Sequence, residues 1–412
     1  MKSKRRFFAT LSVLVVGAAT VTKSLPARAE SPPNISYTNA VVAKVPWSIQ
    51  LVKVPRGNAR YEIQSRHAHG GALGLETLSA QVAAARTERT EPVAAINGGF
   101  YLRDYGRPNP YSGYPRGLQI IDGEVTSSPS GAASLWIDYA GQPHAATVVS
   151  RFEITWPDGR KTPFGLNGPR ADDAIELYTA AVGPSTRTAG GLELILETQP
   201  GGPRLPLRME RDYLAVVRGV HAGGNAPLSP TSLVLSIGPA LMQEFQRVTP
   251  GATVRISTRS LPALLTARTA INGGPVLVRE GRSQKIKSAP DDAYEFSSML
   301  ERHPRTAIGW NEQAFFLVQV DGRQRDLSVG MTLNELSDYL IKLGCAEALN
   351  LDGGGSSSLW FEGKVRNSPC DGYERKIANS LLVVQKNANA GAKRLTSPST
   401  AAPPERGRQN GN

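Results

Sequence analysis

Residues 349–358 read Leu349-Asn350-Leu351-Asp352-Gly353-Gly354-Gly355-Ser356-Ser357-Ser358, an apolar run that ends in one carboxylate, three glycines and three hydroxyls. We expect a buried strand to end at Asp352, so that the carboxylate emerges at the edge of a sheet. The glycines allow successive backbone N–H groups to point into one concavity, which suits an oxyanion such as phosphate. The stretch is not a P-loop, because no Gly-Lys-Ser/Thr follows it. The alternative is a glycine-rich turn without a ligand.

The same pattern occurs twice more in the chain, each time as an apolar strand end followed by Asn-Gly-Gly. Residues 95–100 read Ala-Ile-Asn-Gly-Gly-Phe, and residues 270–275 read Ala-Ile-Asn-Gly-Gly-Pro. Asn/Asp-Gly-Gly also makes ordinary tight turns, but turns rarely need the same flanking residues, so we expect the three corners to line one cleft. The predicted substrate-binding residues are Asn97, Gly98, Gly99, Asn272, Gly273, Gly274, Gly353, Gly354, Gly355, Ser356 and Ser357.

A helix is predicted directly before the strand that ends at Asp352. Thr332 and Glu335 form a capping-box signature, and Gly344 is a suitable stop. The apolar face at helical spacing consists of Leu333, Leu336, Leu340 and Leu343. A helix on a sheet that leads to a strand ending in Asp and glycines is a common way to build a site.

Strand patterns occupy much of the remaining chain. Residues 48–54 alternate and are predicted as a strand, with residues 61–64 as its partner, and Arg305 is predicted to begin another strand after Pro304. Residues 134–260 are rich in strand patterns and carry no recognisable chemical constellation. The predicted fold class is therefore α/β in the broad sense, a mixed α+β fold with a central mixed sheet, packed helices and a β-rich middle region.

The N-terminus has the pattern of a secretory signal peptide. Basic residues at positions 2–6 precede an apolar stretch at residues 7–21, and Ala27-Arg28-Ala29 fits a small-residue cleavage site. We expect cleavage after Ala29, a secreted or periplasmic protein of the cell envelope, and no stable membrane insertion afterwards. The alternative is a membrane anchor, for which the apolar run is short.

The net charge does not predict a nucleic-acid surface. The formal charge of +12 includes +6 from residues 1–29 and +4 from residues 386–412, which leaves about +2 for the remainder. Residues 386–412 are rich in Ala, Pro, Ser and Gly and are predicted to be a disordered tail. Nucleic acid is therefore not an expected partner.

The cysteine count limits the chemistry further. Cys345 and Cys370 are the two cysteines of the chain, and a secreted protein permits a disulfide between them around the Gly-Gly-Gly-Ser corner. Two unpaired thiols are the alternative. Two cysteines and five scattered histidines exclude a cysteine-based metal site and do not suggest a histidine cluster.

The motifs in this order resemble the phosphodiester glycosidase family. The matching stretches are residues 95–100, the Arg-Thr-Ala-Ile-Gly run at 305–309, and residues 328–333, 349–357 and 378–383. With the signal peptide at 1–29 and the tail at 386–412, the resemblance implies a phosphodiester glycosidase domain in two parts, at 30–133 and 261–385, on either side of the β-rich middle region at 134–260. It also implies a glycosidase that hydrolyses N-acetylglucosamine-1-phosphodiester-like bonds in envelope polysaccharide or a phosphoglycan.

Such a substrate needs groups that stabilise a phosphate and an oxocarbenium-like sugar. Arg305 is the expected phosphate clamp, because its fork matches phosphate oxygens, unless it forms a structural ion pair with Asp352. Asp352 is the leading catalytic carboxylate, as nucleophile, base or metal ligand. Asn97 and Asn272 would orient the sugar hydroxyls or the phosphate. Candidates by position for a second carboxylate are Asp104, Asp292 and Glu295.

No cofactor is required by these patterns. The sequence allows a hard divalent cation such as calcium, held by Asp352, an Asn carbonyl and phosphate oxygens, but shows no dedicated cage for it. The alternative to an enzyme is a non-catalytic carbohydrate-binding or exopolysaccharide-assembly protein, which the presence of Asp352 and Arg305 disfavours. A phosphatase or nuclease is disfavoured because no two-metal set of carboxylates and histidines is visible.

Overall fold

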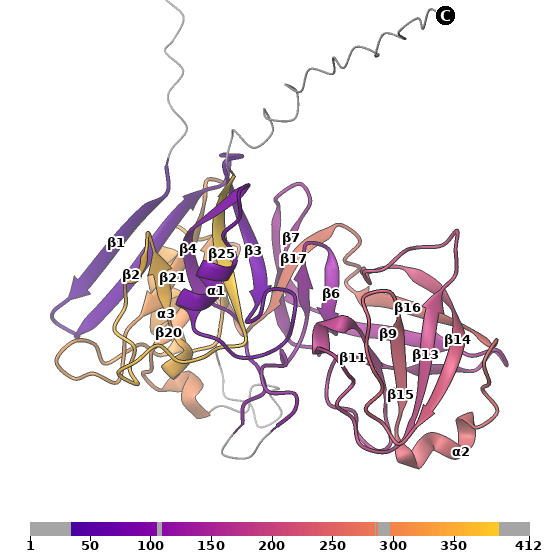
Figure 1. The fold of residues 1–412 in the computed structure, drawn as a ribbon. Helices are drawn as coiled ribbons and strands as arrows, with labels where there is room; N and C mark the ends of the chain where they lie inside the picture. Colours follow the sequence, from indigo (N-terminus) through magenta and orange to yellow (C-terminus); the bar gives the residue numbers. More distant parts are fainter. Residues whose placement is uncertain (1–33, 105–108, 285, 287–296, 387–412) are drawn as a thin grey trace, which may run out of the picture. The chain divides into compact units, whose positions relative to one another are not determined.

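The computed structural model describes residues 34–104, 109–284, 286 and 297–386 (Figure 1). The predicted signal peptide, all but the first residue of the predicted tail, Asp292 and Glu295 lie outside the described residues. The described strands form four sheets. Their pairing is antiparallel apart from one parallel pair, β11 with β12, among the strands that the structure describes.

The seven-stranded sheet carries two of the predicted site motifs. It contains both the strand that leads to Asp352 and the strand that begins at Arg305. Its order is β1 (Ser36–Val42), β2 (Trp47–Pro55), β21 (Ala314–Val320), β20 (Arg305–Trp310), β22 (Glu347–Asn350), β18 (Val276–Arg279) and β19 (Arg282–Ser283).

Two five-stranded sheets carry the other two Asn-Gly-Gly motifs. The first has the order β24 (Lys364–Val365), β23 (Leu359–Phe361), β4 (Thr90–Asn97), β25 (Asn379–Lys386) and β3 (Tyr61–His67). The second has the order β6 (Glu124–Ser127), β5 (Gln119–Ile121), β17 (Ala267–Asn272), β7 (Ala133–Asp138) and β8 (Pro143–Thr147). The predicted strand at 61–64 is present as β3, but its prediction as partner of 48–54 is wrong, because β3 pairs with β25.

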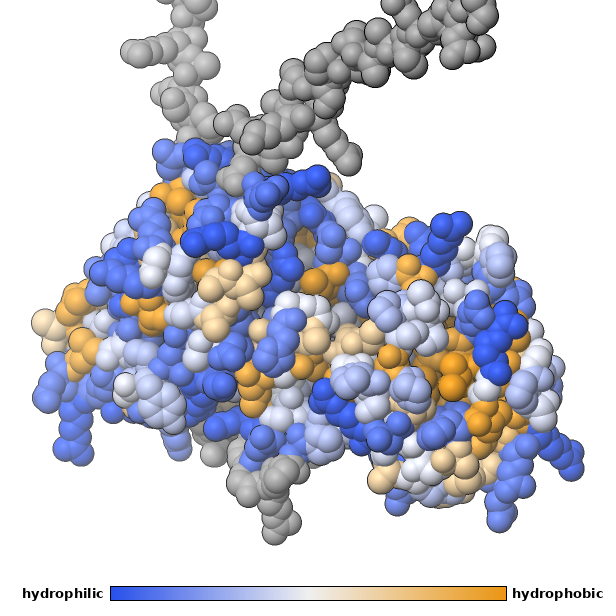
Figure 2. Space-filling model, in the orientation of Figure 1, coloured by the Kyte–Doolittle hydropathy of each residue, from blue (hydrophilic) through white to orange (hydrophobic). Residues whose placement is uncertain are grey.

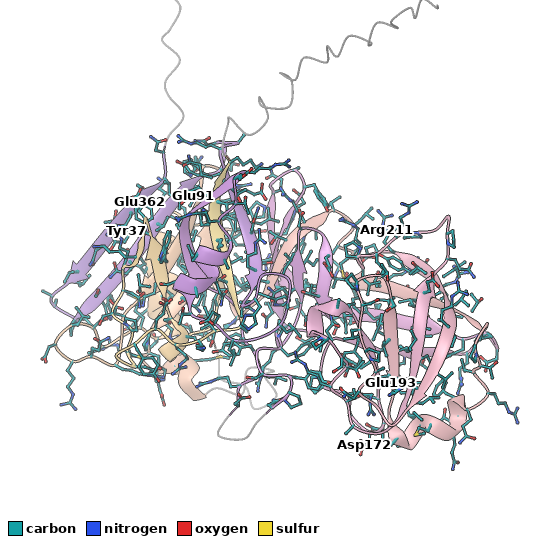
Figure 3. All side chains as sticks on the ribbon, in the orientation of Figure 1. Tyr37, Glu91, Asp172, Glu193, Arg211 and Glu362 are labelled. Carbon is teal, nitrogen blue, oxygen red and sulfur yellow. The ribbon has the colours of Figure 1, made fainter. Side chains whose placement is uncertain are left out.

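The β-rich middle region, predicted at 134–260, contains an eight-stranded sheet, although its first strands, β7 and β8, belong to a five-stranded sheet. The order of the eight-stranded sheet is β10 (Lys161–Pro163), β9 (Val149–Thr155), β16 (Thr253–Leu261), β14 (Asp212–Ala222), β13 (Leu192–Thr198), β15 (Leu233–Ile237), β12 (Ile175–Tyr178) and β11 (Gly165–Leu166). A buried carboxylate on β13, Glu193 (labelled in Figure 3), accepts hydrogen bonds from Thr188 Oγ1 at 2.8 Å and from the Ala226 amide at 2.6 Å. These donors compensate the cost of burying the carboxylate.

Helices are few and short. The α-helices are α1 (Leu78–Ala84), α2 (Met242–Phe245) and α3 (Leu333–Lys342), and the 3-10 turns are η1 (Ala180–Val182), η2 (Pro239–Leu241), η3 (Ser297–Leu300) and η4 (Gly354–Ser356). Helix α3 has the predicted capping box between Thr332 and Glu335 and contacts β18, β19 and β22. The mixed α+β class is thus confirmed, with the sheets as its larger part. No helix among the described residues is long and apolar enough to cross a membrane.

Apolar side chains join the sheets into shared cores. One core combines Val52 of β2, Ile96 of β4, Leu135 of β7 and Leu317 of β21, so it contacts the seven-stranded and both five-stranded sheets. On the visible face of the space-filling view, hydrophilic and apolar residues are intermixed (Figure 2). The burial of these apolar strands places their polar ends, including Asp352, where the sheets meet.

The two thiols are not paired. Cys345 is buried in the core beneath α3, and Cys370 is half-buried beside Asp371, so both are free cysteines. The favoured disulfide is therefore wrong. Cys345 packs closely against Gly309, since a Cβ on Gly309 would lie 2.5 Å from the Cys345 sulfur.

Candidate functional site

Hydrogen bonds join the three glycine corners, which we define as residues 97–99, 272–274 and 352–355. The Asp352 amide donates to the Gly98 carbonyl at 3.0 Å, and Asn97 Nδ2 donates to the Asp352 carbonyl at 2.7 Å. The Gly274 amide donates to the Asn350 carbonyl at 2.7 Å. The strand ends of β4, β17 and β22 therefore converge, as the repeated motif predicted.

Close packing explains why glycines follow Asn97. A Cβ on Gly98 would overlap the Asn379 side chain, and a Cβ on Gly99 would overlap the carbonyl and side-chain oxygens of Asn272. Any larger residue would separate the first corner from the second. These two glycines thus allow the corners to approach one another.

A cavity of about 460 Å³ lies over the corners, a volume in the range of small-molecule sites. Eight of the predicted residues line it: Asn272, Gly274, Arg305, Asp352, Gly353, Gly354, Gly355 and Ser356. Five do not: Asn97, Gly98, Gly99, Gly273 and Ser357. Direct contact of these five with a substrate stays a prediction.

Asn97 has a clear role within the protein. It is buried, its Nδ2 donates to the Asp352 carbonyl at 2.7 Å, and its Oδ1 accepts from Thr306 Oγ1 at 2.6 Å and from the Ser358 amide at 3.0 Å. Asn97 therefore fixes both sides of the turn that carries Asp352.

The Asp352 carboxylate is held by its own turn. The Gly353 amide donates to Asp352 Oδ1 at 2.9 Å. Burial raises the pKa of the Asp352 carboxyl to about 6, while hydrogen bonds from Ser356 and Gly353 and the charge of Arg375 act in the opposite direction. A carboxyl that titrates near neutrality can exchange protons during a reaction at physiological pH.

Arg305 reaches the cavity from the first position of β20, but its guanidinium also binds the main chain. Its Nε donates to the Met331 carbonyl at 2.8 Å and its Nη2 to the Glu301 carbonyl at 2.7 Å. Burial, followed by the charge of Arg323, lowers the pKa of Arg305 to about 10. The alternative of an ion pair is not observed, because among the described residues no salt bridge joins Arg305 to Asp352.

Four further arginines line the cavity, and sequence reasoning missed them: Arg103, Arg116, Arg323 and Arg375. Arg375 is fixed by Asp371 through bonds of 2.6 and 2.9 Å, and its guanidinium fills the space where a Cβ of Gly355 would lie. With Arg305 they surround the Asp352 turn with positive charge, which favours an anionic ligand. Isolated arginines carry no spacing pattern, although Arg103 follows the first glycine corner closely.

The cavity also contains His303, Tyr101 and Asn350, which sequence reasoning did not select. Tyr101 is buried and its hydroxyl lies 3.4 Å from Ser356 Oγ. Burial and the charge of Asp352 raise the pKa of Tyr101, so its hydroxyl is a donor at neutral pH. Of these three residues, Asn350 was the one that the sequence could have indicated, because it lies two residues before Asp352.

Among the described lining residues, Asp352 is the one carboxylate. Asp104 is exposed and lies outside the lining. The other two candidates for a second carboxylate, Asp292 and Glu295, lie outside the described residues. The second carboxylate of an ordinary glycosidase therefore stays a prediction.

The described residues contain no group of three or more His, Cys, Asp or Glu side chains that could hold a metal ion. Asn272 Oδ1 and Asn350 Oδ1, from two residues that line the cavity, are buried without a hydrogen-bond partner in the described part of the chain. Among the described residues that line the cavity, the charged ligand atoms available to a cation are thus the two carboxylate oxygens of Asp352. Calcium at this position stays a prediction.

Comparison with known proteins gives a match to one family model over part of the chain. Residues 216–384 match the family model described as phosphodiester glycosidase. The SPbeta prophage-derived uncharacterized protein YomE of Bacillus subtilis (strain 168) is 39% identical over 83 residues, which is 20% of this chain and 13% of that protein. The N-acetylglucosamine-1-phosphodiester alpha-N-acetylglucosaminidase of Bos taurus is 26% identical over 102 residues, or 24% of this chain and 19% of that protein. The chain thus matches less than a fifth of the length of each relative.

A solved structure shares the fold over most of the chain. The crystal structure of a hypothetical protein from Synechocystis aligns with a TM-score of 0.67 and 21% identity, covering 87% of this chain and 65% of that chain. This likeness concerns the fold, and the site must be interpreted from the residues described above.

Proposed function

We propose that this chain, whose residues 216–384 match the phosphodiester glycosidase family model, hydrolyses the bond between an anomeric sugar carbon and a phosphodiester. The observation that carries the proposal is the setting of Asp352, a titratable carboxylate in a cavity whose described lining also includes five arginines and one histidine. A sugar linked to phosphate requires this combination of charges, since the phosphate needs cations and the sugar centre needs a carboxylate.

The arginines of the cavity have different roles in the proposal. Arg323 and Arg375 lie over Gly354 and Gly355 of the turn that follows Asp352, and we assign them to the phosphate. Arg305 is buried and bound to two carbonyls, and it contributes a further positive charge to the lining of the cavity. This arrangement shifts the expected phosphate clamp from Arg305 alone to a set of arginines.

Asp352 then serves the anomeric carbon. The leaving group is a phosphate monoester, which departs with little or no protonation, so one carboxylate can carry the step. Ionised Asp352 acts on the developing oxocarbenium ion, as nucleophile or as base for a water molecule. Retention of configuration in the released sugar would identify the nucleophile, and inversion would identify the base.

The substrate class and the location belong to the same proposal. We propose an N-acetylglucosamine-1-phosphodiester-like unit of an envelope polysaccharide or phosphoglycan as the substrate, supported by the family and the charge of the cavity. Secretion is supported by the signal-peptide pattern at residues 1–29.

The test is hydrolysis of a synthetic N-acetylglucosamine-alpha-1-phosphodiester by the purified protein, with and without EDTA. Asp352→Asn should lower kcat/KM by about 10²–10⁴-fold, because the amide cannot act as nucleophile or base. Asp338→Asn, the same change on the exposed face of α3, should leave kcat/KM unchanged. Binding without turnover in the wild-type protein would favour the non-catalytic carbohydrate-binding alternative. Loss of turnover in EDTA would indicate a metal at Asp352.

A further inference from the structure

We infer that His303 is a positioning residue that holds Arg323 over the Asp352 turn only while its imidazole ring is neutral. The inference rests on the proposed function, because it gives Arg323 its task on an anionic substrate group. It adds to the proposed function a dependence of anion binding on the protonation of His303.

The contacts form a chain from solvent to the cavity. His303 Nε2 lies 3.0 Å from Glu301 Oε2, and the Nε and Nη2 atoms of Arg323 each lie 3.3 Å from His303 Nδ1. Arg323 can donate to Nδ1 only if that nitrogen carries a lone pair, so the hydrogen of the neutral ring is on Nε2 and points to Glu301. Glu301 thus selects the tautomer that accepts from Arg323.

The backbone places Arg323 where this contact matters. Arg323 has a φ of 61°, a left-handed conformation that is uncommon for a residue with a side chain. A Cβ on Gly354 would lie 3.2 Å from Arg323 Nη2, so the guanidinium covers the glycine turn. The Gly354 amide also donates to the Pro304 carbonyl at 2.9 Å. The segment 303–304 therefore positions both the turn and the arginine above it.

Protonation of His303 would break this arrangement. A hydrogen on Nδ1 would point at the N–H groups of Arg323, and two cations would face each other at 3.3 Å. The charged groups around the ring are Glu301 on its own segment, Arg323 from the loop after β21 and Arg305 on β20. Glu301 favours the protonated ring, and the two arginines and burial oppose it.

Arg375 provides a matched control within the same cavity. It lies over Gly355 as Arg323 lies over Gly354, but it is held by the carboxylate of Asp371 at 2.6 Å rather than by an imidazole. Removal of Arg375 should weaken anion binding and keep its dependence on His303. Removal of Arg323 should weaken binding and abolish that dependence.

The experiment measures binding of methyl N-acetylglucosamine-alpha-1-phosphate, a diester of fixed charge, by calorimetry between pH 5 and pH 8. It uses Asp352→Asn protein, which prevents turnover and removes the titration of Asp352. We expect Kd to rise about tenfold as His303 protonates. This change corresponds to the loss of about one charge-assisted hydrogen bond to the ligand. Adding His303→Asn, whose Oδ1 replaces Nδ1 as acceptor and does not titrate, should remove the rise while keeping the affinity of pH 8.

Two controls separate the inference from the proposed function. With Arg375→Ala the rise of Kd on acidification should persist, and with Arg323→Ala it should disappear. Independently of ligand, NMR titration should show a higher pKa for His303 in Arg323→Ala than in the wild type. An unchanged His303 pKa, or an affinity that is constant or stronger at pH 5, would overturn the inference. Failure of the wild-type protein to hydrolyse the diester would contradict the proposed function alone.

Discussion

At the scale of one residue, Asp352 is a group that the proposed function needs and that lowers the stability of the fold. The carboxyl is needed for the proposed chemistry, yet burial raises its pKa to about 6 from the ordinary 3.8. The folded protein therefore holds a proton that the unfolded chain releases between these two pH values. The free energy of unfolding must fall as pH rises through this window, and the penalty is complete above pH 6.

Replacement of Asp352 by Asn should consequently stabilise the protein while it removes activity. Above pH 6 we expect a gain in the free energy of unfolding on the order of 1–2 kcal/mol, after allowance for the partial exposure of the side chain. At about pH 3, below the ordinary pKa of 3.8, the gain should almost vanish, because Asp352 is then mostly protonated in both states. Urea unfolding of both proteins at pH 7.5 and about pH 3 measures the difference. An equal effect at the two pH values would show that burial is not the cause.

At this scale, sequence reasoning selected residues that line the cavity where those residues belong to a motif. Asp352, Asn272 and the glycines of the third corner were found because an apolar strand end with Asn or Asp and glycines occurs three times. Arg323 and His303 were not found, because their function depends on a contact between segments 20 residues apart. A single arginine or histidine in a loop has no periodicity or spacing that marks it.

At the scale of the element, the glycine at position 355 of the turn 353–355 is required by packing, whereas Gly354 also has a left-handed φ of 61°. A Cβ on Gly355 would overlap the Arg375 guanidinium and the Asp371 carboxylate, both of which are ends of side chains. Such groups can move at low cost, so the fold should tolerate a methyl group that the site does not.

The variant Gly355→Ala tests this reading of the turn. We expect Arg375 to be displaced and kcat/KM for the phosphodiester to fall about tenfold or more, with a change in unfolding midpoint no larger than that of the control. Gly57→Ala is the control, because no heavy atom lies within 4 Å of a Cβ at Gly57. Steady-state kinetics and thermal unfolding of both variants give the comparison. Loss of stability without loss of activity would contradict the assignment of Arg375.

Local patterns at this scale predicted elements better than their partners. The capping box and leucine spacing identified helix α3, and the alternation at 48–54 identified β2, because each signal lies within one segment. The partner of β3 was missed because β25 lies more than 300 residues further along the chain. Pairing across that distance is decided by the shared core. A hydrophobic pattern within one segment does not specify which distant strand will be its partner.

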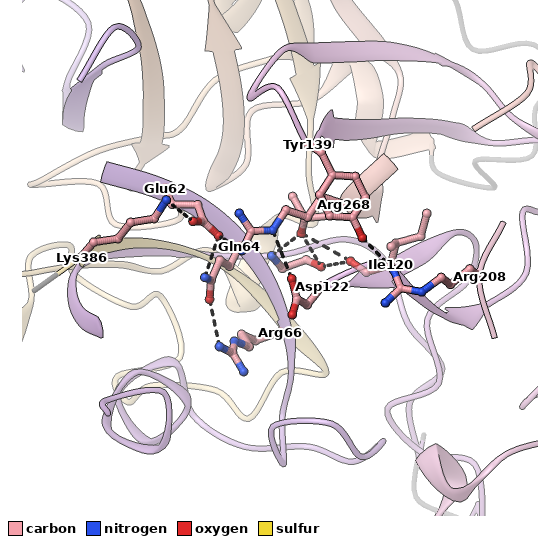
Figure 4. A network of polar contacts seen from close by, with 11 residues as sticks. Glu62, Gln64, Arg66, Ile120, Asp122, Tyr139, Arg208, Arg268 and Lys386 are labelled. Atoms are coloured by element: carbon pink, nitrogen blue, oxygen red, sulfur yellow. Dashed lines mark hydrogen bonds and ion pairs between the residues drawn. The ribbon is translucent and has the colours of Figure 1, made fainter. Parts of the chain in front are cut away.

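At the scale of the whole molecule, polar contacts join sheets that are far apart in sequence. Figure 4 shows Arg268 of β17 between Glu62 of β3 and Asp122, at 2.8 and 3.1 Å. These partly exposed ion pairs should contribute little to stability. Beneath them, the Ser65 amide donates to Thr269 Oγ1 at 2.7 Å and Ser65 Oγ donates to the Ile120 carbonyl at 2.6 Å.

The buried contact should matter more than the visible network, because Ser65 and Thr269 are almost inaccessible to water. Thr269→Val would leave the Ser65 amide without its acceptor inside the core, at a cost of about 1–3 kcal/mol in the free energy of unfolding. Thr269→Ser keeps the hydroxyl and should cost less, and Arg268→Met should cost less than Thr269→Val. Urea unfolding of the three variants ranks them. If Arg268→Met proved the most destabilising, the ion pairs rather than the buried hydrogen bond would hold the two five-stranded sheets together, and the glycine corners that those sheets bring to Asp352 would depend on ionic strength.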